Sequence, residues 1–154
     1  MKAWAQLKPL FIVGLTVVAT TAQAKTALTI EHLTKLNKIS DVVLSGDGRF
    51  LVYGQKNGGL APADTSADLY LMDLQDGNKI KRLTDSEGKE HSVRFSNDNN
   101  SLYFIADRSG SSQVWQLPLT GGEARQLTAL PLDVQGYLVS ADNKKLVVAL
   151  DVVP

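Results

Sequence analysis

Serine residues near the middle of the chain are the first candidates for covalent chemistry. The run Arg108-Ser109-Gly110-Ser111-Ser112-Gln113 comes nearest to G-x-S-x-G, the strained strand-to-helix turn that exposes a serine nucleophile. It lacks the second glycine and falls between two expected strands, so it is better interpreted as a hairpin loop. The sequence therefore predicts no catalytic residue in this chain.

The chain offers few side chains of the types that bind transition metals. The chain has two histidines and no cysteine, and no H-x-x-x-H or H-E-x-x-H spacing, so a catalytic zinc site has little support. His32 falls in an expected helix and His91 opens the second repeat beside Glu90. Both histidines are expected to be structural or exposed, and no metal or cofactor site is predicted.

Two further motifs also favour turns over ligand sites. Asn97 to Asn100 resemble a calcium loop, but an EF-hand counted from Asp98 needs glycine and glutamate where Tyr103 and Ser109 stand. The pairs Gly58-Gly59 and Gly121-Gly122 are not followed by Gly-Lys-Ser/Thr, so neither is a phosphate loop.

The first 24 residues have the features of a secretory signal peptide. Lys2 and Lys8 make the start positive, the apolar stretch Leu10 to Ala19 follows, and Ala22-Gln23-Ala24 fits an A-x-A cleavage site. An uncleaved anchor is the alternative, but this apolar stretch is well short of the roughly 20 residues that span a bilayer. We expect cleavage after Ala24 and a periplasmic or secreted protein; without cysteine, a lipoprotein anchor is excluded.

Charge gives no sign of a nucleic-acid partner. Cleavage leaves 14 basic and 16 acidic side chains, a net charge near −2. Such a balance is no electrostatic footprint for nucleic acid or an anionic membrane. We expect neither partner once the leader is removed.

Residues 25–38 are predicted to be a linker and a short helix. Apolar residues recur every three positions at Ile30, Leu33 and Leu36, and the Thr29 hydroxyl can cap the first turn. The expected helix runs from about Ile30 to Asn37. So short a helix is marginal alone and is expected to pack on the next part of the chain.

After Ile39 the sequence repeats itself. Residues 43–53, 94–104 and 138–148 align, with the repeated serine at 45, 96 and 140, spaced by 51 and 44 residues. Residues 69–74 and 114–119 also align, and each is followed by a glycine turn and a segment ending in Leu-Thr, at Thr84 and Thr128. In the second unit, strands are expected near 92–95, 101–106, 113–119 and 124–127.

The repeated S-x-D-[G/N] element indicates a tight reversal between two strands. Its aspartates can bond the backbone of their own turn. The next residue is always glycine or asparagine, the types that tolerate a left-handed backbone. The aspartates are Asp47, Asp98 and Asp142, followed by Gly48, Asn99 and Asn143.

Four-stranded units of about 40–45 residues in tandem are typical of β-propeller blades. The predicted fold is all-β: a signal peptide (1–24) and short helix, then an incomplete β-propeller over residues 39–154. It has about two and a half blades, near 39–84, 91–128 and 134–154. A small β-sandwich is the alternative. Because a propeller needs about four blades to close, the chain looks truncated, and its open edges are expected to favour aggregation.

Two other features have structural interpretations. Tyr70 and Trp115 occupy equivalent strand positions, which favours blade-to-blade packing over a ligand site. Gln55 to Asp68 is the longest irregular stretch, and loops of this kind are candidate contact sites.

Several of these segments together resemble one family. They are Leu28–Leu33, Ile39–Arg49, Asp73-Leu74 with Arg82-Leu83-Thr84, and Gly121–Thr128. With the leader, they resemble the start of secreted bacterial serine peptidases of the prolyl oligopeptidase family, in the dipeptidyl peptidase and acylaminoacyl peptidase group. The resemblance covers nearly all of the chain from Leu28. The proline of the family's S-P-D-G turn is replaced by Gly46, Asn97 and Ala141. TolB-like periplasmic propellers use the same repeat.

The resemblance implies a role without catalysis. The family's serine, aspartate and histidine belong to an α/β-hydrolase domain after the propeller, and no position here matches them. Its propeller filters access to the active site, and in dipeptidyl peptidases acidic residues there help bind the substrate amino terminus; neither Glu87 nor Glu90 lies in a matching motif. We therefore expect a non-catalytic, substrate-gating propeller fragment of an exported serine peptidase acting on short peptides, whose substrates bind through the catalytic domain. The alternatives are a TolB-like periplasmic propeller that binds a protein partner and a gene remnant.

Overall fold

The computed structural model describes residues 28–56, 67–85 and 88–152. A short helix, α1 (Ile30–Thr34), precedes ten strands. The strands are β1 (Lys38–Leu44), β2 (Phe50–Lys56), β3 (Asp68–Asp73), β4 (Lys79–Arg82), β5 (Glu90–Phe95), β6 (Ser101–Ala106), β7 (Gln113–Pro118), β8 (Arg125–Gln126), β9 (Val134–Val139) and β10 (Leu146–Leu150). The signal peptide prediction falls outside the described residues.

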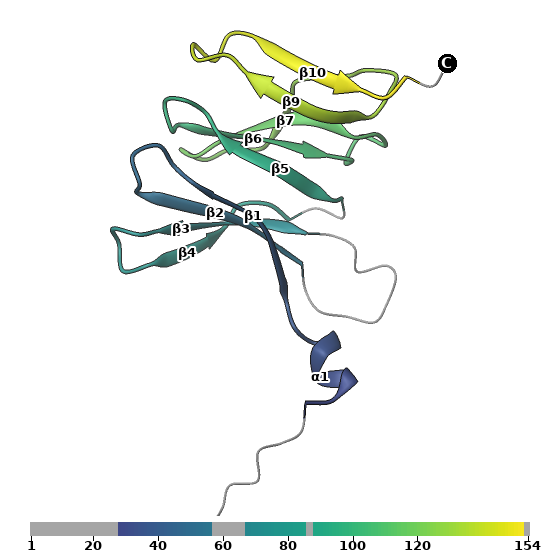
Figure 1. The fold of residues 1–154 in the computed structure, drawn as a ribbon. Helices are drawn as coiled ribbons and strands as arrows, with labels where there is room; N and C mark the ends of the chain where they lie inside the picture. The colour runs from purple at the N-terminus through teal and green to yellow at the C-terminus, as the bar shows by residue number, and fades with distance from the viewer. Residues whose placement is uncertain (1–27, 57–66, 86–87, 153–154) are drawn as a thin grey trace, which may run out of the picture.

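The strands form stacked antiparallel sheets. β1–β4 and β5–β8 are four-stranded sheets whose spatial order follows the chain, and β9 and β10 form a two-stranded sheet. We call them the first, second and third blades. They lie one above another, and β1 contacts β5 directly (Figure 1). Repeated meanders of this kind are propeller blades and lack the Greek-key connections of a sandwich, so the predicted fold class is confirmed.

The helix begins as expected but ends earlier. Thr29 Oγ1 accepts from the His32 N–H at 3.3 Å, and His32 Nδ1 accepts from the Thr29 N–H at the same distance. The helix ends at Thr34, not near Asn37, because Lys35 caps it and the Leu36 N–H turns back to the Leu33 carbonyl. The expected packing is not seen among the described residues: the apolar side chains of α1 are largely exposed.

Strand ends in the second blade lie within two residues of the predicted ones. The predicted irregular stretch Gln55 to Asp68 is shorter than expected, because Gln55 and Lys56 continue β2 and Asp68 begins β3. Both Gln55 and Asp68 are paired across these strands. The rest of that stretch, residues 57–66, lies outside the described residues, and so does its suggested role as a contact site.

The three S-x-D-[G/N] turns have the same geometry. In each, the serine Oγ donates to the aspartate Oδ1 at 2.5 Å. The aspartate Oδ1 accepts from the N–H two residues later, and the serine Oγ accepts from the N–H five residues later. The residue after the aspartate is left-handed, with φ of 71° at Gly48, 56° at Asn99 and 57° at Asn143. The turn chemistry expected from the sequence is confirmed.

The apolar core lies between the blades. One cluster joins the first and second blades and includes Val52, Leu69, Leu102 and Phe104. A second cluster joins the second and third blades and includes Tyr103, Ile105, Val114 and Tyr137. Each sheet is therefore stabilised mainly by burying its faces against its neighbours.

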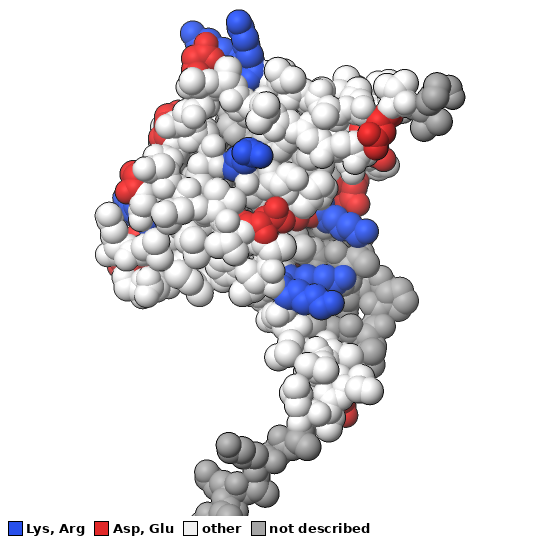
Figure 2. All heavy atoms as spheres, in the orientation of Figure 1, with Lys and Arg blue, Asp and Glu red and all other residues white. Residues whose placement is uncertain are grey.

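The outer surface carries mixed charge. Acidic and basic side chains are scattered over the face shown in Figure 2, without a large patch of one sign. Among residues 28–56, 67–85 and 88–152, no helix has the length and apolar character needed to cross a bilayer.

Candidate functional site

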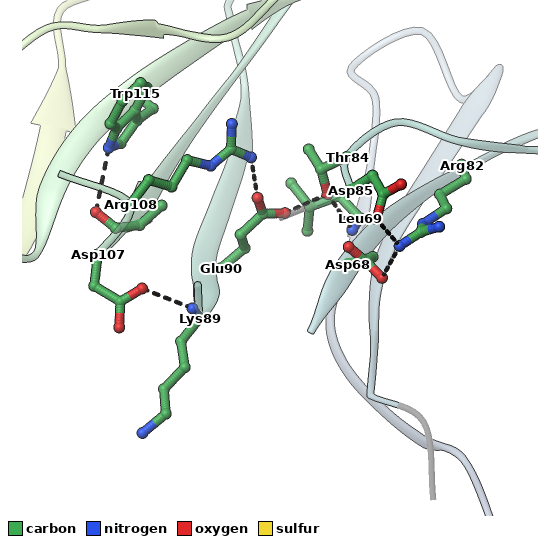
Figure 3. Close-up of polar contacts among 11 residues, drawn as sticks. Asp68, Leu69, Arg82, Thr84, Asp85, Lys89, Glu90, Asp107, Arg108 and Trp115 are labelled. Atoms are coloured by element: carbon green, nitrogen blue, oxygen red, sulfur yellow. Dashed lines mark hydrogen bonds and ion pairs between the residues drawn. The ribbon is translucent and has the colours of Figure 1, made fainter. Parts of the chain in front are cut away.

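A cluster of buried and partly buried polar side chains lies between the first and second blades. Its centre is Glu90, the first residue of β5, whose side chain is 0% exposed. Glu90 Oε2 accepts a short hydrogen bond from the Thr84 hydroxyl, and Glu90 Oε1 is ion-paired with Arg108 (Figure 3). Thr84 follows β4 of the first blade, so the carboxylate joins two sheets.

The guanidinium group of Arg108, which pairs with Glu90, also lies over the aromatic rings of Phe104 and Trp115. Its guanidinium carbon lies 5.3 Å from the Phe104 ring centroid and 5.4 Å from that of Trp115. The Trp115 indole N–H is itself bonded to the Ala106 carbonyl at 3.2 Å. These contacts orient the guanidinium, and stacking on aromatic faces is favourable for arginine. Trp115 thus packs at a blade interface, as expected, and Tyr70 stacks on Tyr53 within the first blade.

The Thr84 hydroxyl both accepts and donates a hydrogen bond. Its Oγ1 accepts from the Leu69 N–H at 2.8 Å while its O–H donates to Glu90. Neither the hydroxyl nor the carboxylate is exposed, and charged groups are seldom so buried unless paired. The arrangement resembles a hydroxyl beside a base, but the hydroxyl is occupied and buried. It serves to join blades.

A rim of charges surrounds the buried centre. Arg82 donates to Asp68 at 2.7 Å and to Asp85 at 2.6 Å. Asp107 Oδ1 accepts from the Lys89 N–H at 2.8 Å, and a Cβ at Gly88 would lie only 2.5 Å from this oxygen. A larger residue at position 88 would therefore displace the Asp107 carboxylate from its bond to the Lys89 N–H.

The second blade has an uncharged cluster at its own Leu-Thr ending. Thr128 Oγ1 accepts from the Val114 N–H at 2.9 Å and donates to Gln113 Oε1 at 2.7 Å. Gln113 Nε2 donates to the Leu130 and Leu132 carbonyls. Thr84 thus ties the first blade to the second, whereas Thr128 is bonded within its own blade to Gln113 of β7, and Gln113 in turn holds the connection that leads to β9.

The sequence candidates are placed apart from one another. The Ser109–Gln113 run lies in the β6–β7 connection, with Gln113 beginning β7. His32 caps α1, and His91 Nδ1 lies 3.1 Å from Ser92 Oγ. The Asp98 turn is a strand reversal, and the described residues contain no group of three metal-ligand side chains.

Sequence reasoning did not single out Glu90, Arg108 or Gln113 as partners. The signal available was the repeated Leu-Thr ending, followed in the first repeat by a glutamate at the start of the next strand. Glu90 and Arg108, 18 positions apart, come together because β5 pairs with β6, with Glu90 opposite Ala106.

Comparison with known proteins assigns the family. The family model PD40, the TolB beta propeller domain, matches residues 45–151. The chain belongs to this TolB-type β-propeller family.

Its curated relatives include peptidases. The chain is 26% identical over 127 residues to an uncharacterized peptidase, YuxL, of Bacillus subtilis. The aligned region covers 82% of this chain and 19% of the relative. It is 28% identical over 125 residues to dipeptidyl-peptidase 5 of Porphyromonas endodontalis, covering 81% of this chain and 18% of the relative. The chain therefore spans about a fifth of the length of these relatives.

A solved structure of TolB is also similar. TolB from Acinetobacter baumannii superposes with a TM-score of 0.59 and 26% identity, covering 71% of this chain and 26% of that one. The propeller segment is thus related both to peptidase propellers and to TolB.

Proposed function

We propose that this chain is the non-catalytic propeller segment of an exported serine peptidase that acts on short peptides, and that it gates substrate access. The observation that carries the proposal is the similarity to dipeptidyl-peptidase 5 and to YuxL across 81–82% of this chain. The peptide class of substrate comes from those relatives' names.

The blade interfaces support a gating role. A filter that selects substrates by size must hold its wall in place while peptides pass. Here neighbouring blades are joined by apolar clusters and by hydrogen bonds of buried side chains, from Thr84 to Glu90 and from Tyr137 to the Ser92 carbonyl. Buried polar groups satisfied in this way favour one fixed blade arrangement.

TolB-like binding of a protein partner is the second candidate. It is favoured by the match to the TolB family model and by the 26% identity to TolB over 71% of the chain. Both candidate functions include export, with cleavage of the leader after Ala24, as part of the proposal.

One fractionation experiment separates the two. Antibodies raised against residues 25–154 are used to blot and to immunodeplete the periplasmic fraction, with pre-immune serum as the control. The peptidase proposal expects a product several-fold longer than 154 residues, and depletion should remove hydrolysis of a Gly-Pro or Ala-Pro chromogenic dipeptide. A product that co-purifies with another protein, with hydrolysis unaffected by depletion, would instead favour the TolB-like role.

The segment itself is tested separately. Purified residues 25–154 should not hydrolyse the same dipeptides, because no position in the chain matches the serine, aspartate and histidine of the peptidase family's catalytic domain. Turnover by this purified segment, abolished by a serine-directed inhibitor, would contradict the non-catalytic assignment.

A further inference from the structure

The fourth residue of each S-x-D-[G/N] turn differs between blades. It is Gly48 in the first blade and asparagine in the second and third. All three are left-handed, and the hydrogen bonds within the three turns are equivalent. Since glycine completes the first turn, the turn itself does not require an asparagine side chain.

Both asparagine side chains bond to the preceding blade. Asn99 Oδ1 accepts from the Gly46 N–H at 2.9 Å, across 53 positions of sequence. Asn143 Oδ1 accepts from the Asn97 N–H at 3.2 Å, across 46 positions. At the second crossing, the Asn97 side-chain amide also donates to the Ser140 carbonyl at 3.0 Å.

The donor is in each case the second residue of the preceding turn. That position carries proline in the S-P-D-G form of the turn, and proline has no N–H to donate. In this chain it is Gly46, Asn97 or Ala141, so the N–H is present each time. An asparagine in one blade can therefore accept this hydrogen bond only if the turn of the preceding blade has no proline at its second position.

We propose that the turn asparagines are cross-blade latches, each recognising the free N–H of a non-proline residue in the turn of the preceding blade. The latch fixes how neighbouring turns sit against each other at one end of the stacked sheets. It is independent of whether the protein is a peptidase or a partner-binding propeller.

Amide hydrogen exchange of the full chain, read at single-residue resolution, tests the first latch. Asn99→Gly keeps a residue that adopts the left-handed backbone freely and removes only the acceptor. Exchange of the Gly46 amide should then accelerate roughly five- to tenfold, as expected for one net hydrogen bond. The Ser101 amide, bonded to Ser96 Oγ within the same turn, should keep its rate.

Gly48→Asn is the matched control. It places asparagine in the left-handed position of the first turn, where an added Cβ meets nothing within 4 Å. It should leave exchange of the Gly46 amide unchanged. Unchanged Gly46 exchange in Asn99→Gly, or equal acceleration at Gly46 and Ser101, would overturn the latch.

A double-mutant cycle covers the case in which single-residue exchange is affected by global unfolding. Gly46→Pro removes the donor, and its ring carbon takes the place of the hydrogen that faces Asn99 Oδ1, so the Asn99 side chain must turn away in this variant. If donor and acceptor form one latch, adding Asn99→Gly to Gly46→Pro should lower the urea midpoint no further. Strictly additive shifts in the midpoint would refute the pairing.

Discussion

Replacing Arg108 with methionine tests the buried network most directly. Methionine keeps an unbranched side chain against Phe104 and Trp115 but leaves the Glu90 carboxylate, with a side chain 0% exposed, without its cation. Removing one partner of a buried ion pair costs about 3–5 kcal/mol. Because the Arg108 side chain is 21% exposed, we expect a cost at the lower end of this range. The lost cation–π interactions with the two rings add about 1 kcal/mol, so the expected loss of stability is roughly 4 kcal/mol.

Trp115 provides the assay. The other tryptophan, Trp4, lies in the predicted leader, so in residues 25–154 fluorescence reports on Trp115 alone. A loss of roughly 4 kcal/mol corresponds to a fall of about 1–4 M in the urea midpoint for slopes of about 1–3 kcal/mol per M. The titration is made at low protein concentration, because open blade faces favour association.

Two variants show whether the loss of stability comes from breaking the ion pair between Arg108 and Glu90. Arg125→Met removes an exposed arginine whose side chain donates to the neutral Gln116 side chain, and should change stability by about 0.5 kcal/mol or less. Glu90→Gln combined with Arg108→Met should be more stable than Arg108→Met alone, because an amide can accept from Thr84 as Gln113 accepts from Thr128. A midpoint for Arg108→Met equal to that of Arg125→Met would refute the reasoning.

Three further predictions concern the turns, the second blade interface and export. Hydrogen bonds from the turn serines lower the pKa of Asp47, Asp98 and Asp142 below 3.8. The stabilisation from these carboxylates is therefore complete above about pH 5 and is lost as the pH falls toward their folded-state pKa, so the urea midpoint should drop in that range. The drop should be smaller in a variant in which all three aspartates are replaced by asparagine. Tyr137→Phe should cost about 1 kcal/mol, because its phenol, whose pKa is raised by burial, donates to the Ser92 carbonyl at 2.7 Å; an unchanged melting temperature would contradict this. Amino-terminal sequencing of periplasmic material should begin at Lys25, and a product starting at Met1 would disprove cleavage.

Local structure followed closely from the sequence. The S-x-D-[G/N] turns depend on hydrogen bonds between residues two to five positions apart, so residue type and spacing were enough to predict them. Repetition of these turns with apolar strands between them then indicated blades. The end of α1 was less predictable, because the spacing of apolar residues continued past Thr34 whereas the backbone did not.

The contacts between blades were decided only by the tertiary structure. Glu90 with Thr84, and Asn99 with the Gly46 N–H, depend on how two sheets are stacked, and no periodicity in the chain encodes that offset. The sequence thus determined which strands form and how each turn closes, because those interactions are local. Stacking alone decided that a glutamate would be buried and that an asparagine would bond to the neighbouring blade, because burial and long-range hydrogen bonds exist only once distant segments pack together.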